Sequence, residues 1–137
     1  MKNNVWVCLE QNDGKIAGVS FEMLSEARKL ADQLSGKVGA VLMGAGVKEL
    51  AKEAVAYGAD EVYVCDDEQL KNYRTDAYTR VLEDLVKGKE PGILLLPATT
   101  NGRDLAGRLA SRLEAGLAAD CVALRLEDGQ LVATRPI

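Results

Sequence analysis

The chemistry-bearing residues of this chain gather in one short polar loop between an apolar run and a helical pattern. Residues 94–96 are three leucines, typical of a buried strand, and an amphipathic pattern starts again at Leu105. A loop that leads from a strand into a helix directs free backbone N–H groups and the positive helix end outward, where they bind anions. The hydroxyls, the glycine and the guanidinium of this loop suit a phosphate or a flavin. The candidate cofactor-binding residues are Thr99, Thr100, Asn101, Gly102 and Arg103.

A purely structural interpretation of the same loop stays open. Thr100 or Asn101 could serve only as the helix N-cap, with Asp104 placed favourably in the first turn. Asp104, Arg108 and Arg112 recur at a spacing of four, so they share one helix face. Such a stripe is typical of a solvated, salt-bridged surface, and arginines also serve subunit contacts.

A second glycine-containing turn, Gly44-Ala45-Gly46, follows another apolar run. It could cradle a phosphate, although a tight strand-to-helix turn is the favoured interpretation. The chain contains neither the G-x-x-x-x-G-K-[ST] pattern of P-loop proteins nor a G-x-G-x-x-G after a strand. An ordinary dinucleotide-binding fold is therefore disfavoured.

The composition excludes several classes of protein. The chain has no histidine, which removes Ser–His and Cys–His catalysis and histidine-ligated zinc. Its three cysteines, Cys8, Cys65 and Cys121, are far apart and are expected to be small buried hydrophobes. A net charge of -4 disfavours nucleic-acid binding. With neither a secretory signal nor a membrane-length apolar run, we expect a cytoplasmic protein without catalytic residues or a metal site.

Strand and helix patterns alternate along the chain. Strands are predicted over residues 5–9, 37–43, 61–65 and 93–96, and a hairpin over 121–126 and 131–135 around a turn at 127–130. Helices are predicted from Ser20 to about Ser35, from Val47 to Gly58, from Thr75 to Pro91, and around residues 105–113, with Ser20 and Thr75 as N-caps and Gly36 as a C-cap. This order predicts one α/β domain, residues 1–137, with a mainly parallel sheet between two helix layers and an antiparallel edge hairpin. Ligands of such sheets bind beyond the carboxyl ends of the strands.

Several segments together carry a family resemblance. They are YGADEVYV at 57–64, YRTDAY at 73–78, GRDLA at 102–106, GLAADC at 116–121 and the closing Thr134-Arg135-Pro136, with an opening at Trp6-Val7, Glu10-Gln11 and 19–22. In order and spacing they resemble the alpha subunit of electron transfer flavoprotein. The opening is most similar to anaerobic bacterial members, some of which bifurcate electrons.

The resemblance implies an adenine-nucleotide-hydrolase-like, Rossmann-like fold of the universal-stress type. It also implies that this chain is the N-terminal domain only, and that the FAD belongs to a C-terminal domain outside it. We accordingly expect no cofactor in this chain itself. The implied function is structural and partner-binding, in a heterodimer that carries electrons through FAD. Residues 117–121 and the helix start at Arg103 are expected near the subunit interface.

The implied partners are the beta subunit and, through the complete heterodimer, acyl-CoA or other dehydrogenases. With its partner surface uncovered, the isolated domain could self-associate. The alternative function is a universal-stress-type module that binds ATP or another adenine nucleotide. Modules of that type are expected to carry a glycine-rich run after the fourth strand. Here residues 97–102 have the sequence PATTNG, which is not such a run.

Overall fold

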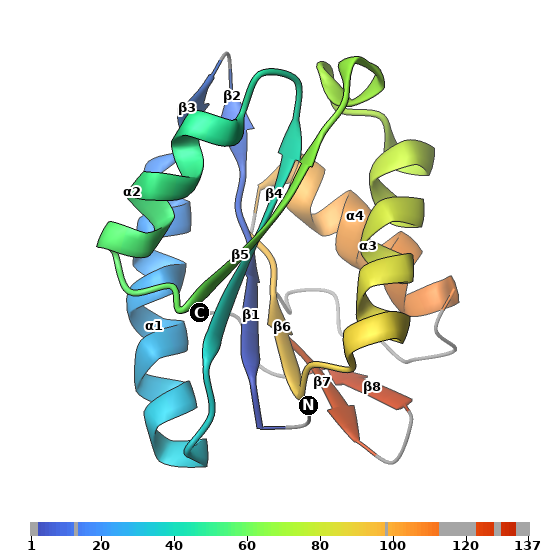
Figure 1. Ribbon diagram of the computed structural model, residues 1–137. Helices are drawn as coiled ribbons and strands as arrows, with labels where there is room; N and C mark the ends of the chain where they lie inside the picture. The colour runs from blue at the N-terminus through green and yellow to red at the C-terminus, as the bar shows by residue number, and fades with distance from the viewer. Residues whose placement is uncertain (1–2, 13, 98, 113–122, 128–129, 134–137) are drawn as a thin grey trace.

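A central sheet with helices on both faces forms the body of the molecule (Figure 1). The structure, a computed structural model, describes residues 3–12, 14–97, 99–112, 123–127 and 130–133. The strands are β1 (Val5–Cys8), β2 (Gln11–Asn12), β3 (Lys15–Ile16), β4 (Val38–Gly44), β5 (Glu61–Asp66), β6 (Ile93–Leu95), β7 (Ala123–Glu127) and β8 (Gln130–Ala133). The helices are α1 (Gly18–Leu34), α2 (Ala51–Ala56), α3 (Thr75–Lys89) and α4 (Thr100–Arg112), with short 3₁₀ turns η1 (Lys48–Leu50) and η2 (Glu68–Leu70).

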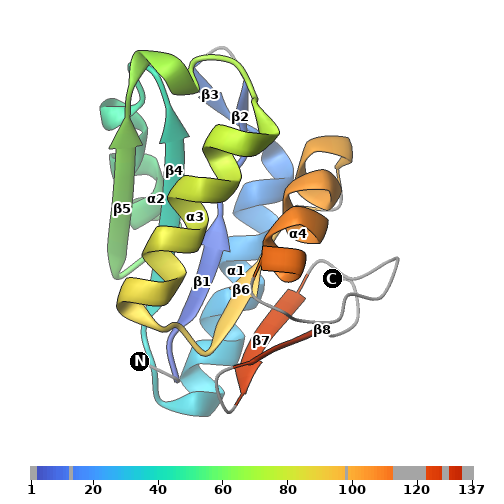
Figure 2. The same ribbon diagram turned by 90° about the vertical axis from the view of Figure 1, so that its right-hand side faces the viewer.

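The main sheet has the order β5-β4-β1-β6-β7-β8. The first four strands run parallel, whereas β7 pairs antiparallel with both β6 and β8. Figure 2 shows α3 and α4 in front of this sheet and α1 and α2 behind it. The predicted three-layer fold with a mainly parallel sheet and an antiparallel edge hairpin is therefore confirmed. In the described part of the chain, no helix is long and apolar enough to cross a membrane.

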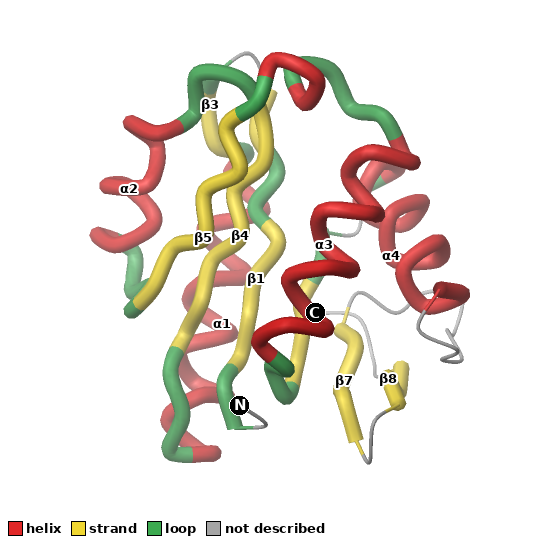
Figure 3. Tube along the Cα trace, turned by 45° about the vertical axis from the view of Figure 1, so that its right-hand side comes forward, coloured by secondary structure: helices red, strands yellow, loops and turns green. Residues whose placement is uncertain are grey.

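The sheet separates two hydrophobic cores because alternate side chains of a strand point to opposite faces. Val5 and Val7 of β1 pack with the apolar faces of α1 and α2. Trp6 and Cys8 of the same strand pack with α3 and α4 on the other side. Figure 3 shows α3 and α4 next to each other, with α1 and α2 across the sheet. Both cores rest on strands that are apolar at nearly every position, as expected for a parallel sheet.

Two predicted caps are wrong. Ser20 lies inside α1, which starts at Gly18, and its buried hydroxyl accepts a hydrogen bond from the N–H of Glu10 (2.8 Å). Thr75 is the first residue of α3, and its hydroxyl donates to Asp104 instead of capping its own helix. In both cases a tertiary acceptor or donor satisfies the hydroxyl better than the local helix end does.

The C-terminus of α1 also differs from the prediction. Ser35, and not Gly36, adopts the left-handed conformation (φ 55°). Gly36 is needed for space, since a Cβ there would lie 1.7 Å from the carbonyl oxygen of Asn3. Gly58 does end the α2 segment as predicted, with φ of 113°. The small hairpin of β2 and β3 and the 3₁₀ turn η2 are additions that were not predicted.

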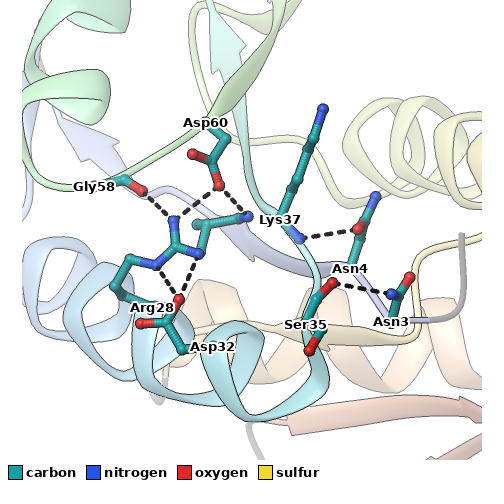
Figure 4. Close-up of polar contacts among 9 residues, drawn as sticks. Asn3, Asn4, Arg28, Asp32, Ser35, Lys37, Gly58 and Asp60 are labelled. Atoms are coloured by element: carbon teal, nitrogen blue, oxygen red, sulfur yellow. Dashed lines mark hydrogen bonds and ion pairs between the residues drawn. The ribbon is translucent and has the colours of Figure 1, made fainter.

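A polar cluster fastens the amino ends of β4 and β5 to α1 (Figure 4). The Arg28 guanidinium donates to Asp32, to the Gly58 carbonyl and to Asp60 (2.8 Å for Asp60). Asp60 also accepts the backbone N–H of Val38 (2.9 Å). This bond and the Arg28 pair hold the pKa of Asp60 below its ordinary value. The Gly58-to-Asp60 part of the YGADEVYV segment thus has a structural role. It lies at the amino ends of the parallel strands, whereas the candidate loop follows the carboxyl end of β6.

Candidate functional site

A cavity of about 200 Å³ lies at the carboxyl ends of the parallel strands. It occupies the edge of the sheet where the connections from β1 and β6 leave in opposite directions, which is where ligands of open α/β sheets bind. Its lining combines apolar side chains with several amides. The lining residues are Cys8, Leu9, Glu10, Gln11, Asn12, Met43, Lys71, Asn72, Tyr73, Tyr78, Pro97, Asn101, Gly102 and Leu105.

Thr99 caps α4 and ties it to the end of β1. Its hydroxyl accepts the backbone N–H of Gly102 (3.1 Å) and donates to Oε1 of Glu10 (2.6 Å). The N–H of Arg103 donates to the carbonyl oxygen of Thr99 (2.9 Å). The N-cap is therefore Thr99, and not Thr100 or Asn101, which the structural interpretation named. The Thr99 hydroxyl and the Gly102 N–H, which the sequence suggests as donors to an anion, are instead hydrogen-bonded within the protein.

Gly102 brings α4 against the end of β6. A Cβ at this position would lie 2.0 Å from the carbonyl oxygen of Pro97 and 2.8 Å from its Cγ. These distances are far below an ordinary contact, so no side chain fits without a shift of backbone. The structure thus gives this glycine a packing role at the helix start.

The five candidate residues do not converge on one point. Asn101 and Gly102 line the cavity, whereas Thr99, Thr100 and Arg103 are not among its lining residues. Arg103 and Thr100 are exposed, and Thr99 is half-buried. The strongest polar groups in the cavity, Glu10 and Lys71, were not predicted. Glu10 could have been found, because it follows β1 directly at the carboxyl edge of the sheet.

The Gly44-to-Gly46 turn is closed by a carboxylate of this chain. One oxygen of Asp66 accepts the N–H of Gly46 (2.8 Å) and the other accepts the N–H of Val47 (3.0 Å). The Gly46 and Val47 bonds help to hold the pKa of Asp66 below its ordinary value. The donors of this turn are occupied, so the interpretation as a tight turn is confirmed over that of a phosphate cradle.

The acidic and basic stripe on α4 makes contacts inside the molecule at both ends. Asp104 accepts hydrogen bonds from the Tyr73 and Thr75 hydroxyls, and the Thr75 bond, followed by the Tyr73 bond, lowers the pKa of Asp104. Arg112 lies 3.4 Å from Glu83 of α3. Arg108 is exposed between these two contacts. The Arg112 end of the stripe thus forms an ion pair with α3, whereas the Asp104 end is held by two hydroxyls.

The cysteine side chains are consistent with inert packing where they are described. Cys8 is buried beneath the cavity, and this burial raises the pKa of its thiol to about 12. Cys65 is half-buried, and its pKa is raised by the same cause. Cys121 and the predicted interface segment 117–121 lie outside the described residues. Within the described residues, acidic and cysteine side chains do not gather in groups of three that could hold a metal ion.

Comparison with known proteins assigns the family. The model of the electron transfer flavoprotein domain matches residues 5–137. The chain belongs to the electron transfer flavoprotein family. The alpha subunit from Thermoanaerobacterium thermosaccharolyticum is 48% identical over 134 residues, and that from Megasphaera elsdenii is 47% identical over 134 residues. A protein named acryloyl-CoA reductase electron transfer subunit beta, from Anaerotignum propionicum, is 47% identical over 129 residues.

These alignments cover nearly all of this chain but a minor part of each relative. They span 97%, 96% and 94% of the chain and 41%, 40% and 35% of the three relatives, respectively. The chain therefore spans about two-fifths of the length of the curated relatives that it matches. The predicted relationship to alpha subunits of anaerobic bacteria is confirmed.

The family implies a flavin, so the described residues can be tested for their fit to FAD. The cavity is smaller than the roughly 300–1,000 Å³ of ordinary ligand pockets. Glu10, an acidic residue, is part of its lining and disfavours phosphate, and the capped start of α4 has already used the Gly102 N–H. The residues at this edge of the sheet do not fit FAD.

Proposed function

We propose that this chain is the N-terminal domain, residues 1–137, of an electron transfer flavoprotein alpha subunit, with a structural and partner-binding function. The observation that carries the proposal is the family match across residues 5–137, together with relatives that are more than twice as long. In the complete protein, FAD would be held by residues outside this chain. Neither bond-making catalysis nor a cofactor is assigned to the domain itself.

The proposed partner is the beta subunit of an electron transfer flavoprotein, in a heterodimer that exchanges electrons with acyl-CoA or other dehydrogenases. The name of the Anaerotignum propionicum relative, an electron transfer subunit of acryloyl-CoA reductase, supports a dehydrogenase of this general kind. Flavin-based bifurcation, cytoplasmic location and self-association of the isolated domain remain predictions. The family match gives no support to the universal-stress alternative.

Binding to a beta subunit tests the proposal. We expect light scattering of the mixed proteins to give a one-to-one complex. Arg108→Glu should weaken this complex, because Arg108 is exposed on α4 and supplies the charge that a partner would meet. Lys52→Glu is the control, since Lys52 is also exposed but lies on α2, across the sheet.

The two variants separate the outcomes. Absence of any complex would overturn the partner-binding function. A complex that resists Arg108→Glu would place the contact elsewhere and show that this arginine is merely solvated. The adenine-nucleotide alternative is tested by ATP, which must raise the unfolding temperature of the chain if the native state binds it. We expect ATP to leave that temperature unchanged.

A further inference from the structure

We propose that the connection between β5 and α3 is a gate over the sheet-edge cavity, and that Asp104 is the latch that keeps this gate closed. We call residues 71–74 the strap. The strap connects η2 to α3 and follows the carboxyl edge of the sheet (Figure 2). This inference goes beyond the proposed function. Binding to a beta subunit does not involve the cavity, whereas the gate concerns access to it.

The cavity lies between the strap and the start of α4. Lys71, Asn72 and Tyr73 of the strap line one side of it, and Asn101 and Gly102 line the other. The strap has no regular secondary structure, and three of its four residues are exposed. Such a segment belongs to the part of a fold that opens at low free-energy cost.

Two segments that the sequence singles out separately meet at the latch. The Tyr73 hydroxyl (2.9 Å) and the Thr75 hydroxyl both donate to the same oxygen of Asp104. Tyr73 and Thr75 belong to YRTDAY and Asp104 belongs to GRDLA, so 29 to 31 residues separate the bonded groups. One carboxylate thus fastens the carboxyl-terminal end of the strap to the N-terminal half of α4.

The other end of the strap is held independently of the latch. Leu70, just before the strap, is buried, and its carbonyl oxygen accepts the Tyr78 hydroxyl. Removing the Asp104 carboxylate breaks both latch bonds and leaves this anchor intact. The expected motion is therefore an outward displacement of residues 71–74 between their two fixed ends, Leu70 and α3, without unfolding of the domain.

The reactivity of Cys8, which lines the cavity, can be used to measure opening of the gate. Its thiol lines the cavity and the residue is only 3% exposed. With its pKa raised to about 12, the thiol reacts slowly until the cavity opens to water. Alkylation at Cys8 therefore measures how often the strap is open. Cys65 lies on β5 before the strap and is half-buried, so its labelling in the folded protein serves as an internal reference at a site outside the gate.

The experiment measures alkylation by iodoacetamide, read at each cysteine by peptide mass spectrometry. We expect Asp104→Ala to accelerate labelling of Cys8 at least tenfold and Tyr73→Phe, which removes one donor but keeps the ring, to accelerate it a few-fold. Cys65 labelling should change less than twofold. Glu83→Gln is the matched control, because it weakens the Arg112–Glu83 contact between the same two helices away from the strap. It should leave Cys8 labelling unchanged.

Urea separates gating from loss of the fold. Labelling through a local opening is nearly independent of low urea, whereas labelling through global unfolding rises steeply with it. Asp104→Asn keeps the size of the side chain if Asp104→Ala is poorly folded. Fast, urea-independent labelling of Cys8 in either variant supports the gate. Unchanged labelling, or acceleration that rises with urea and is matched at Cys65, overturns it.

Discussion

Replacing Gly102 by alanine tests whether this glycine serves packing. Alanine in place of glycine inside a helix would ordinarily raise stability by roughly 0.4–1 kcal/mol, because it restricts the unfolded chain. At Gly102, however, the new Cβ would lie 2.0 Å from the Pro97 carbonyl oxygen, over 1 Å closer than an ordinary contact of 3.4 Å. Either α4 or the end of β6 must move.

The expected net cost follows from these two opposing effects. Overpacking of this kind costs about 1–3 kcal/mol or more, and the helix gain offsets at most about 1 kcal/mol of it. Gly88 offers a matched control, because it lies in α3 with nothing within 4 Å of an added Cβ. Gly88→Ala should therefore raise the free energy of unfolding by roughly 0.4–1 kcal/mol. Because the helix gain is common to both variants, we expect them to differ by the overpacking cost, about 1–3 kcal/mol or more.

Urea unfolding measures this difference. Trp6 is the single tryptophan and is buried, so its fluorescence reports on the core beside α4, and circular dichroism follows the helices. A cost of this size leaves a domain with the usual stability of about 5–15 kcal/mol folded in water. If Gly102→Ala were as stable as Gly88→Ala, the close approach of α4 to Pro97, and with it the packing role of Gly102, would be refuted.

Three further predictions concern single polar contacts. Thr99→Val should lower the free energy of unfolding by about 1 kcal/mol through loss of the α4 cap, whereas Thr100→Val should stay within roughly 0.5 kcal/mol of the parent in the same urea assay. Ser20→Ala should cost about 1–3 kcal/mol, since it leaves the buried N–H of Glu10 without its acceptor; no loss would show that water replaces the hydroxyl. The pKa of Asp60 is lowered in the folded state, so its contribution is present above its ordinary pKa of about 4 and is lost as the pH falls through the folded pKa. Thermal unfolding scanned against pH should accordingly show a shallower acid-side loss in Asp60→Asn, and an unchanged slope would contradict the role of this carboxylate.

The layers of the fold could be predicted because periodicity records them directly. The runs that became β1, β4, β5 and β6 are apolar at nearly every position, and the helices between them repeat their apolar residues at three and four. The predicted strand ends are within one residue of the observed ends at β1 and β5. Local pattern is sufficient where burial alone decides the structure.

The contacts of polar side chains could not be predicted in the same way. Ser20 and Thr75 carry the usual chemistry of an N-cap, yet each bonds to a residue that is distant in sequence. The preference for a cap is about 1 kcal/mol, so one tertiary hydrogen bond is enough to override it. Thr99 does cap α4, but the second bond of its hydroxyl, to Glu10 across 89 residues, could not be predicted from the local sequence. Only the fold shows that the Thr99 hydroxyl and the Gly102 N–H are already bonded within the protein.

Equilibrium dialysis of the chain against FAD tests the central claim most directly. The account holds that the domain contributes a scaffold and that its sheet-edge cavity does not fit the flavin. It predicts equal FAD concentrations on the two sides of the membrane, with the Thr99→Val and wild-type chains indistinguishable. Saturable retention of one FAD per chain would contradict the account, and loss of that retention in Thr99→Val would place the flavin at the start of α4.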